Sequence, residues 1–384
     1  MTEPPSETNR CRIKEQISLF ADKMADIENY LTDPSRREMK FFLTVFLDKQ
    51  DLKGPTDPRM GLIQKPRQPV TRKLYYENPE LYLTDQLDLI ERRSALGLND
   101  CWVPSLNLIY GINPVAEAFG CQFVRDNNNA VPWAMPVCSD PDLVDTLDAD
   151  LEKSPAGCFI LTTMQNWRNL TQGILPLCAV PIYSPLCTTA QIMGSTEFLT
   201  ALHTHPAKIH TLLDRITDLT IEWVERQYKA AGGNLRGMGQ YHVPATNGVV
   251  LSDDEQVLIS PTMYQEFGVP YISRISERFG GVYLHFCGGN THNLRCLRQI
   301  PGLRGIDSQC NPAQFTTARN ILGDDMLILT RVRDRPAGPK DVSSEYLNRY
   351  IELAQDTRTI LWIFTDDPGF RSDRPDLVPR RLYG

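Results

Sequence analysis

The sequence predicts a (β/α)₈ barrel, which is a closed sheet of eight parallel strands surrounded by helices. From about residue 102 onward, short apolar runs alternate with amphipathic helical segments, and this alternation is typical of parallel strands joined by crossover helices. Six such strands are centred near residues 102, 177, 240, 283, 305 and 328, and the run TILWIF is a seventh. We expect the eighth in the N-terminal part. A doubly wound open sheet is the alternative, but no GxGxxG motif follows an early strand.

The N-terminal part has helical spacing before the barrel pattern begins. Residues 10–46 carry apolar side chains three and four positions apart, and a polar connection with prolines follows over 48–71. We therefore expect a helical extension and connection over residues 1–75 and the barrel over 76–384. The next segment, 80–96, is an amphipathic helix that Gly97 ends, and the strand CWVPSLNLIYG follows it.

The middle of the chain adds an excursion to the alternating pattern. Two short apolar runs flank an Asn-rich turn in residues 119–137, which predicts a β-hairpin. A buried strand opens the stretch 175–194, and a long helical block over 196–231 ends at a Gly-Gly pair. Three histidines fall in that block, at positions 203, 205 and 210; His203 and His205 do not share a helical face, so we interpret all three as packing or surface residues.

Regular alternation resumes after this block. A strand is expected over 238–243, and Ser260-Pro261 is a helix start, because serine caps the free N–H groups and proline fits the first turn. Pro270 predicts a bend in the helix that follows. The remaining expected strands cover 281–287, 303–308, 326–332 and 359–364, and the remaining helices lie around 294–297, over 312–322 and over 344–354.

Composition excludes several classes of protein. The formal charge is −7 with no basic run, which argues against nucleic-acid binding. No stretch approaches the roughly 18 consecutive apolar residues of a membrane-spanning helix, and the N-terminus does not read as a signal peptide. The ten cysteines are scattered without a CxxC pair, which is typical of reduced thiols in the cytoplasm.

The stretch GVYLHFCGGN, residues 281–290, carries the strongest chemical signal. His285 and Cys287 are two residues apart at the end of a buried strand, so they project to the same face. An imidazole beside a thiol suits a transition metal, above all zinc. Chance alone would produce roughly 0.16 such pairs in this composition, but active groups of a barrel lie at the carboxyl ends of its strands, where this pair falls.

Other expected strand ends supply further candidates. Asp253 and Tyr241 are candidate catalytic residues that could handle a proton, although an acidic residue in a solvated loop is the plainer interpretation of Asp253 or its neighbour Asp254. Tyr183, Asn247 and Arg331 are candidate substrate-binding residues, because an arginine can pair with an anionic substrate group. The other strand-end candidates are His242, Asp307, Arg333, Asp366 and Asp367. Cys310 is a possible third metal ligand, whereas Cys296 is better explained by packing.

Taken together, these blocks resemble the uroporphyrinogen decarboxylase superfamily, and within it the corrinoid-dependent methyltransferases of the methylcobalamin:coenzyme M type. The resemblance runs from about Leu81 onward through NDCWVPSLNLIYG, VPIYSPLCTTAQIMG, the LSDDE and LISPTMYQEF segments and LHFCGG. It implies a uroporphyrinogen decarboxylase-like TIM barrel with His285 and Cys287 as zinc ligands. The methyltransferases place a third ligand in a Gly-Cys-Gly turn after the last strand, where this sequence reads TDDPG, so Asp367 or Asp366 is the expected replacement.

The same resemblance implies an activity. Zinc would bind a thiol or another nucleophile, and a methyl group would pass between a small methylated substrate or thiol and a corrinoid cofactor carried on a partner protein. Two alternatives stay open: decarboxylation of a tetrapyrrole or related carboxylated substrate, and a ligand-binding barrel without catalysis.

Overall fold

The chain folds as a (β/α)₈ barrel, as the alternating pattern predicts. The computed structural model describes residues 7–46, 62–63, 71–108, 110–125, 131–180, 182–237, 247–288, 290–332 and 344–365. The strands are β1 (Met39–Phe46), β2 (Leu62–Ile63), β3 (Leu106–Asn107), β4 (Gln122–Val124), β5 (Trp133–Met135), β6 (Leu177–Cys178), β7 (Ile182–Tyr183), β8 (Leu235–Arg236), β9 (Val249–Ser252), β10 (Val282–Phe286), β11 (Leu303–Ser308), β12 (Leu327–Val332) and β13 (Thr359–Thr365).

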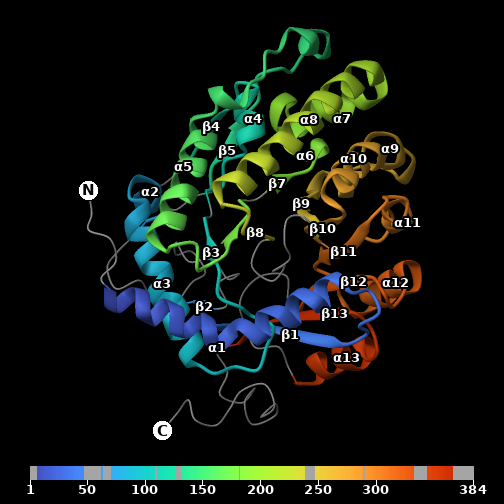
Figure 1. Ribbon diagram of the computed structural model, residues 1–384. Helices are drawn as coiled ribbons and strands as arrows, with labels where there is room; N and C mark the ends of the chain where they lie inside the picture. The colour runs from blue at the N-terminus through green and yellow to red at the C-terminus, as the bar shows by residue number, and fades with distance from the viewer. Residues whose placement is uncertain are drawn as a thin grey trace.

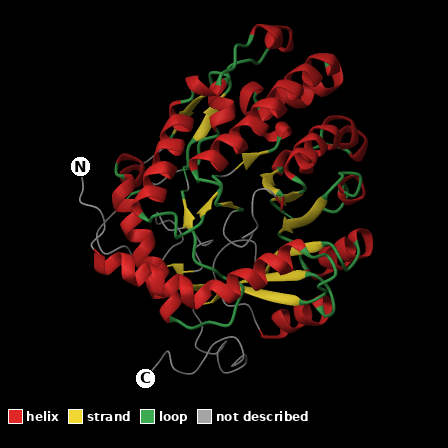
Figure 2. Ribbon diagram, viewed as in Figure 1, coloured by secondary structure: helices red, strands yellow, loops and turns green. Residues whose placement is uncertain are grey.

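Parallel pairing closes the barrel in a ring. One side runs in the order β1-β13-β12-β11-β10-β9-β7, and the other runs β3-β6-β8. Only three residues separate β6 from β7, so one short stretch of chain contributes a strand to each of the two sheets. The remaining gap in the ring lies between β1 and β3. The N–H of Cys101, just before β3, donates to the carbonyl oxygen of Phe41 on β1 at 2.7 Å and so connects the two strands. β8 pairs with β6 and β9 pairs with β7. Counting β6 with β7 as one strand and β8 with β9 as another, the ring has eight members, and helices surround it (Figures 1 and 2).

The eighth strand corrects the expected N-terminal helix. α1 covers Glu7–Thr32 only, and residues 39–46 form β1, which pairs with β13 from Met39↔Thr359 onward. The run MKFFLTVF is rich in aromatic and β-branched residues, which favour a strand, and Pro34 ends the helical pattern before it. Part of the expected extension over residues 1–75 therefore belongs to the barrel sheet.

The helices enclose this ring. They are α2 (Arg72–Glu77), α3 (Pro79–Ala95), α4 (Pro114–Ala118), α5 (Pro155–Leu170), α6 (Pro185–Met193), α7 (Ser195–Thr204), α8 (Pro206–Ala230), α9 (Pro261–Phe267), α10 (Val269–Phe279), α11 (Leu294–Leu297), α12 (Pro312–Leu322) and α13 (Ser344–Ala354), with short 3₁₀ turns η2 (Pro141–Thr146), η3 (Leu151–Lys153) and η5 (Asp254–Leu258).

A repeated dipeptide, Ser-Pro or Asn-Pro, starts many of these helices. At the start of α5, α6 and α9 a serine side chain accepts an N–H of the first turn, and at the start of α3, α4 and α12 an asparagine does the same. Proline then occupies the first turn, where its missing N–H costs nothing. The helix start expected at Ser260-Pro261 is confirmed, and the bend at Pro270 corresponds to the break between α9 and α10.

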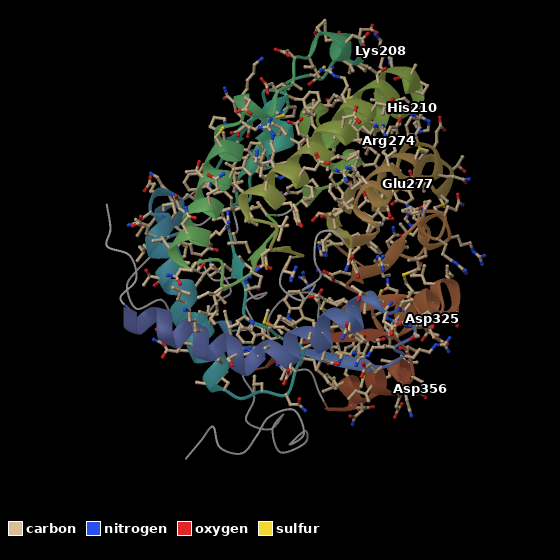
Figure 3. All side chains as sticks on the ribbon, in the orientation of Figure 1. Lys208, His210, Arg274, Glu277, Asp325 and Asp356 are labelled. Atoms are coloured by element: carbon tan, nitrogen blue, oxygen red, sulfur yellow. The ribbon has the colours of Figure 1, made fainter. Side chains whose placement is uncertain are left out.

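The helical block expected over 196–231 is two helices. α7 ends at Thr204 and α8 begins at Pro206, because proline lacks the N–H that a continuous helix would need. His210 packs against Phe267 with the ring centroids 4.6 Å apart, and its Nδ1 lies 2.6 Å from the hydroxyl of Tyr271. The interpretation of His210 as a packing residue is therefore confirmed, and Figure 3 places it in the outer helical layer with Arg274.

The expected hairpin is confirmed and lies at the carboxyl end of the barrel strands. β4 and β5 pair antiparallel with Val124 opposite Trp133. The N–H groups of Val137 and Cys138 donate to Ile192 of α6, which follows the carboxyl end of β7. Within the described part of the chain, six of the eight exposed large hydrophobic residues lie between 124 and 143, so the outer face of this excursion is apolar.

α1 covers the opposite, amino end of the barrel. The hydroxyl of Tyr283, at the start of β10, donates to the carbonyl of Leu31 at 2.7 Å. The hydroxyl of Tyr30 donates to the carbonyl of Thr359, the first residue of β13, at 3.1 Å. These buried bonds fix the end of α1 against the amino ends of the strands. Nowhere in the described residues does a helix have the length and hydropathy that a membrane crossing requires.

Candidate metal centre

Three neighbouring strands, β9, β10 and β11, bring the candidate site together at their carboxyl ends. They are parallel, and His285 on β10 lies in register with Ser252 on β9 and with Asp307 on β11. The chain leaves β9 into η5 and leaves β10 into the glycine-rich turn. As a result Asp254, His285 and Cys287 each offer a ligand atom, and these three atoms all lie within 4.8 Å of one another.

The distance between His285 and Cys287 fits a shared metal ion. The Nε2 atom of His285 lies 3.7 Å from the Sγ atom of Cys287. Two ligands at typical zinc–nitrogen and zinc–sulfur distances, separated by a tetrahedral angle, would lie about 3.6 Å apart. The Cys287 side chain is exposed, so the sulfur faces solvent. The predicted pair therefore has the spacing that zinc requires.

Asp307 orients the imidazole of His285. Its Oδ2 atom lies 2.8 Å from Nδ1 of His285, and the Asp307 side chain is buried. With a carboxylate accepting the proton of Nδ1, the lone pair of Nε2 can face the cluster, as in many carboxylate–histidine–zinc arrangements. Burial lowers the pKa of His285, but the charge and hydrogen bond of Asp307 outweigh burial and raise this pKa to about 10. A metal ion would have to displace that proton.

Asp254 is the third member of the cluster. Its Oδ1 atom accepts the N–H of Cys287 at 2.6 Å, which ties η5 to the glycine-rich turn. Its carboxylate is half-buried and supplies an oxygen ligand that zinc accepts. One imidazole, one thiolate and one carboxylate would leave a fourth tetrahedral position for a substrate, which is the arrangement of catalytic zinc sites.

Buried amides hold the two loops of the cluster together. Nδ2 of Asn290 donates to Oε1 of Gln256 at 2.9 Å, and Nδ2 of the buried Asn293 donates to the carbonyl of Gln256 at 2.7 Å. Because Gln256 belongs to η5 and both asparagines follow Cys287, these bonds fix the position of Asp254 relative to Cys287. The cluster therefore has support on the side away from the strands.

Asp253, the candidate catalytic carboxylate, does not join the cluster. Its side chain is fully buried and accepts the Tyr264 hydroxyl at 2.7 Å, while its backbone N–H donates to the carbonyl of His285. Burial raises the pKa of Asp253 to about 6, although hydrogen bonds from Ser184 and Tyr264 lower it. Consecutive residues leave β9 in opposite directions, so the structure places Asp254, and not Asp253, beside His285 and Cys287.

The substrate-binding candidates lie in different places. Tyr183 ends β7 in register with Ser252, close to the strand end that leads into the cluster. Arg331 lies near the carboxyl end of β12, half-buried, with its guanidinium 4.4 Å from the ring centre of Trp362. Asn247 precedes β9 and so lies at the amino end of the barrel; its expected position at a carboxyl strand end is wrong.

The remaining candidates divide into buried cysteines and residues outside the described part. Cys310 is buried with its Sγ atom 3.4 Å from Oγ of Ser308, and Cys296 packs with its Sγ 3.4 Å from the carbonyl of Pro261. Neither belongs to the cluster, so the structure does not place the possible ligand Cys310 beside His285 and Cys287, and the packing role of Cys296 is confirmed. Other candidates lie outside the described residues, namely Tyr241, His242, Arg333, Asp366 and Asp367.

Sequence reasoning did not assign roles to Asp254 and Asp307 in this centre. Both were present as strand-end carboxylates. A usable signal for Asp307 is its place in the LRGIDS strand, since neighbouring parallel strands bring equivalent positions side by side. For Asp254, the signal is the alternation of side chains, which separates it from Asp253.

Comparisons with known proteins identify the family of the chain and agree with the barrel fold. The family model described as "Uroporphyrinogen decarboxylase (URO-D)" matches residues 63–329. A uroporphyrinogen decarboxylase of Flavobacterium johnsoniae is 24% identical over 168 residues, covering 42% of this chain and 45% of the relative. One from Coxiella burnetii is 32% identical over 93 residues, which cover 23% of this chain and 22% of the relative. The matched segments thus span less than half the length of these curated relatives.

A solved structure is similar over a larger part of the chain. It is a methyltransferase from Methanosarcina mazei, with a TM-score of 0.57 and 17% sequence identity, and the match covers 74% of this chain and 79% of that one. At this level of identity the likeness concerns the fold.

Proposed function

Because the chain belongs to the uroporphyrinogen decarboxylase family, whose fold carries its chemistry at the carboxyl ends of the strands, we propose that it is a zinc-dependent methyltransferase. It would transfer a methyl group between a small methylated substrate or thiol and a corrinoid cofactor on a partner protein. The observation that carries this proposal is the cluster of Asp254, His285 and Cys287, with Asp307 behind the imidazole.

The chemistry of the cluster supports a thiol-handling metal. Thiolate and imidazole ligands together select zinc over magnesium or calcium. A free thiol with a pKa of about 8.5 is mostly protonated at neutral pH, and zinc supplies the charge that deprotonates it. His285 and Cys287 would hold the ion, Asp254 would complete three protein ligands, and Asp307 would keep Nε2 of His285 aimed at it. Tyr183 and Arg331 remain candidates for contacting the substrate.

The first test is metal content. We expect about one zinc per chain in protein purified without chelators, measured by mass spectrometry of the metal, and we expect Cys287→Ser to lose most of it. Cys158→Ser is the matched control, because Cys158 is also an exposed free cysteine but lies on α5. Metal-free wild-type protein that takes up no added zinc would contradict the proposal.

The second test is the reaction. The zinc-loaded protein should transfer the methyl group of methylcobalamin to 2-mercaptoethanesulfonate, followed by the absorbance of the cobalamin. Cys287→Ser should lose this activity while Cys158→Ser keeps it. Zinc binding without methyl transfer to this thiol or to a panel of other small thiols would support the metal centre but contradict the proposed methyl transfer to thiols.

The names of the curated relatives favour a second candidate, decarboxylation of uroporphyrinogen or a related carboxylated substrate. Incubation of the folded protein with uroporphyrinogen, followed by chromatography of the oxidised porphyrins, would detect products with fewer carboxyl groups. Turnover that survives Cys287→Ser would favour the decarboxylase over the methyltransferase. Binding without turnover in both assays would indicate a ligand-binding barrel.

A further inference from the structure

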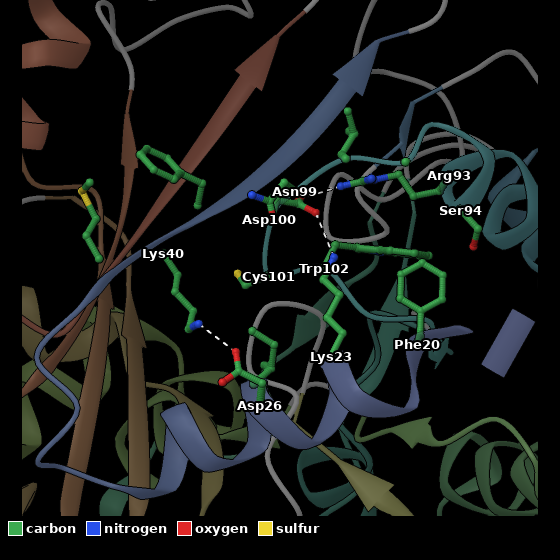
Figure 4. A pocket seen from close by; sticks show the side chains of 15 residues that line it. Phe20, Lys23, Asp26, Lys40, Arg93, Ser94, Asn99, Asp100, Cys101 and Trp102 are labelled. Carbon is green, nitrogen blue, oxygen red and sulfur yellow. Dashed lines mark hydrogen bonds and ion pairs between the residues drawn. The ribbon is translucent and has the colours of Figure 1, made fainter. Parts of the chain in front are cut away.

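A cavity of about 660 Å³ lies at the amino end of the barrel, away from the metal centre (Figure 4). One wall comes from α1, another from the first residues of β1, and a third from the end of α3 and the loop 97–102. The metal centre lies at the carboxyl ends of β9, β10 and β11, so the two sites are at opposite ends of the strands. The volume falls in the range of small-molecule sites, about 300 to 1,000 Å³.

Five charged side chains line the cavity, and its two carboxylates already have partners. Three lining side chains are cationic and two are anionic, which leaves one net positive charge. The buried Asp100 accepts from Nη2 of Arg93 at 2.6 Å and from the N–H of Leu43 at 2.9 Å. The second carboxylate, Asp26, accepts from Nζ of Lys40 at 3.0 Å and from Arg36 at 2.8 Å. The acceptors of the cavity are therefore largely used.

The donors of the cavity exceed these acceptors. Lys23 carries three N–H donors, and its ion pair with Asp100 is long, at 3.5 Å, with a quarter of the Lys23 side chain exposed. Arg93 is 2% exposed, and its Nε atom has no hydrogen-bond partner in the described part of the chain. Burial, together with the charge of Arg93, lowers the pKa of Lys23 by more than the charge of Asp100 raises it. An additional acceptor with negative charge would satisfy these donors.

The remaining walls are apolar and aromatic. The rings of Phe20 and Trp102 meet edge to face with their centres 5.6 Å apart, and the guanidinium of Arg93 lies 4.9 Å from the Trp102 ring centre. Ile27 and Phe41, both buried, also line the cavity. These surfaces suit the body of a ligand that carries few polar groups.

We propose that this cavity binds a small amphipathic monoanion, such as an aromatic or branched-chain carboxylate or sulfonate. Its charged group would lie beside the ammonium groups of Lys23 and Lys40, and its apolar body would lie against Phe20 and Trp102. The single negative charge balances the net charge of the lining residues. This site does not depend on the proposed metal chemistry.

The test uses 8-anilinonaphthalene-1-sulfonate, an aromatic monoanion, and compares it with the uncharged N-phenyl-1-naphthylamine. The exposed hairpin could also bind such dyes, so all titrations use a background variant that carries Trp133→Ser and Met135→Ser. We expect one sulfonate site per chain by fluorescence titration. Lys23→Met should weaken it about tenfold or more, because a hydrogen bond to a charged group is lost, and should leave the uncharged dye nearly unaffected.

Two variants serve as controls. Lys23→Arg keeps the charge and should bind the sulfonate within about threefold of the background protein. Lys208→Met removes a lysine that pairs with Asp145 on the outer surface and should change nothing. Unchanged sulfonate binding in Lys23→Met, or equal losses in Lys23→Met and Lys208→Met, would overturn the proposal.

A second measurement needs no substitution at Lys23 and covers the case in which Lys23→Met fails to fold. Acetic anhydride labels lysines, and peptide mass spectrometry reports the rate at each. The sulfonate should slow labelling of Lys23 severalfold and leave Lys208 unaffected. Equal labelling of Lys23 with and without the sulfonate would overturn the site.

Discussion

Asp254→Asn should remove metal binding while leaving the fold intact, and its neighbour supplies the matched control. The amide oxygen of asparagine can still accept the N–H of Cys287, which Asp254 accepts at 2.6 Å, so only the charge and one metal-binding oxygen are lost. Groups that merely support a metal ligand cost about 10- to 100-fold in metal affinity when they are replaced. A direct ligand should cost at least about 100-fold, or about 2.7 kcal/mol.

Asp253→Asn should behave in the opposite way. Asp253 is buried against Tyr264 and outside the cluster, so zinc affinity should stay within about threefold of wild type. Zinc affinity would be measured by competition with a fluorescent chelator of known affinity. Binding of cobalt would be followed in parallel, because a cobalt–thiolate charge-transfer band reports whether Cys287 still binds the ion.

The result that would refute this reasoning is wild-type zinc affinity in Asp254→Asn. The third ligand would then lie elsewhere, and Asp367→Asn, at the position first expected from the sequence, is the variant that would locate it. A loss of affinity in Asp253→Asn equal to that in Asp254→Asn would also refute the assignment, since it would indicate a general distortion of η5.

Three further predictions concern buried charged side chains near the metal centre and the cavity, namely Asp307, Asp253 and Arg93. Asp307→Asn should weaken zinc binding about 10- to 100-fold in the same competition assay, because His285 loses its orienting carboxylate; unchanged affinity would contradict that role. The pKa of Asp253 is raised from 3.8 to about 6, so the folded state binds an extra proton and stability should fall as pH rises from about 4 to 6, by about 3 kcal/mol. Denaturant titrations should show this loss in wild type and a flatter profile in Asp253→Asn, and equal profiles would refute it. Arg93→Met should lower the free energy of unfolding by about 3 to 5 kcal/mol, because Asp100 would stay buried without its closest cation; urea unfolding would measure it, and a change below about 1 kcal/mol would argue that Lys23 can replace Arg93.

Much of the barrel could be predicted because its elements are local patterns. The runs that form β10, β11, β12 and β13 are short, apolar and separated by helical segments. Each can therefore be recognised as a strand from its own residues, without knowing which strands it pairs with. β1 was harder to identify. Its run follows a helix closely, and the same apolar residues fit helical spacing until the partner strand β13 is known.

The sequence by itself determined the candidate ligand pair of His285 and Cys287, since two residues at a spacing of two at the end of one extended strand project to the same face. It could not determine the third candidate ligand. Asp253 and Asp254 are adjacent in the chain and chemically identical, and only the direction in which β9 ends sends one into the core against Tyr264 and the other toward Cys287. The role of Asp307 likewise depends on the register of β11 against β10. Contacts within one element follow from its local geometry, whereas contacts between elements depend on how the strands align, and that alignment is a property of the closed barrel.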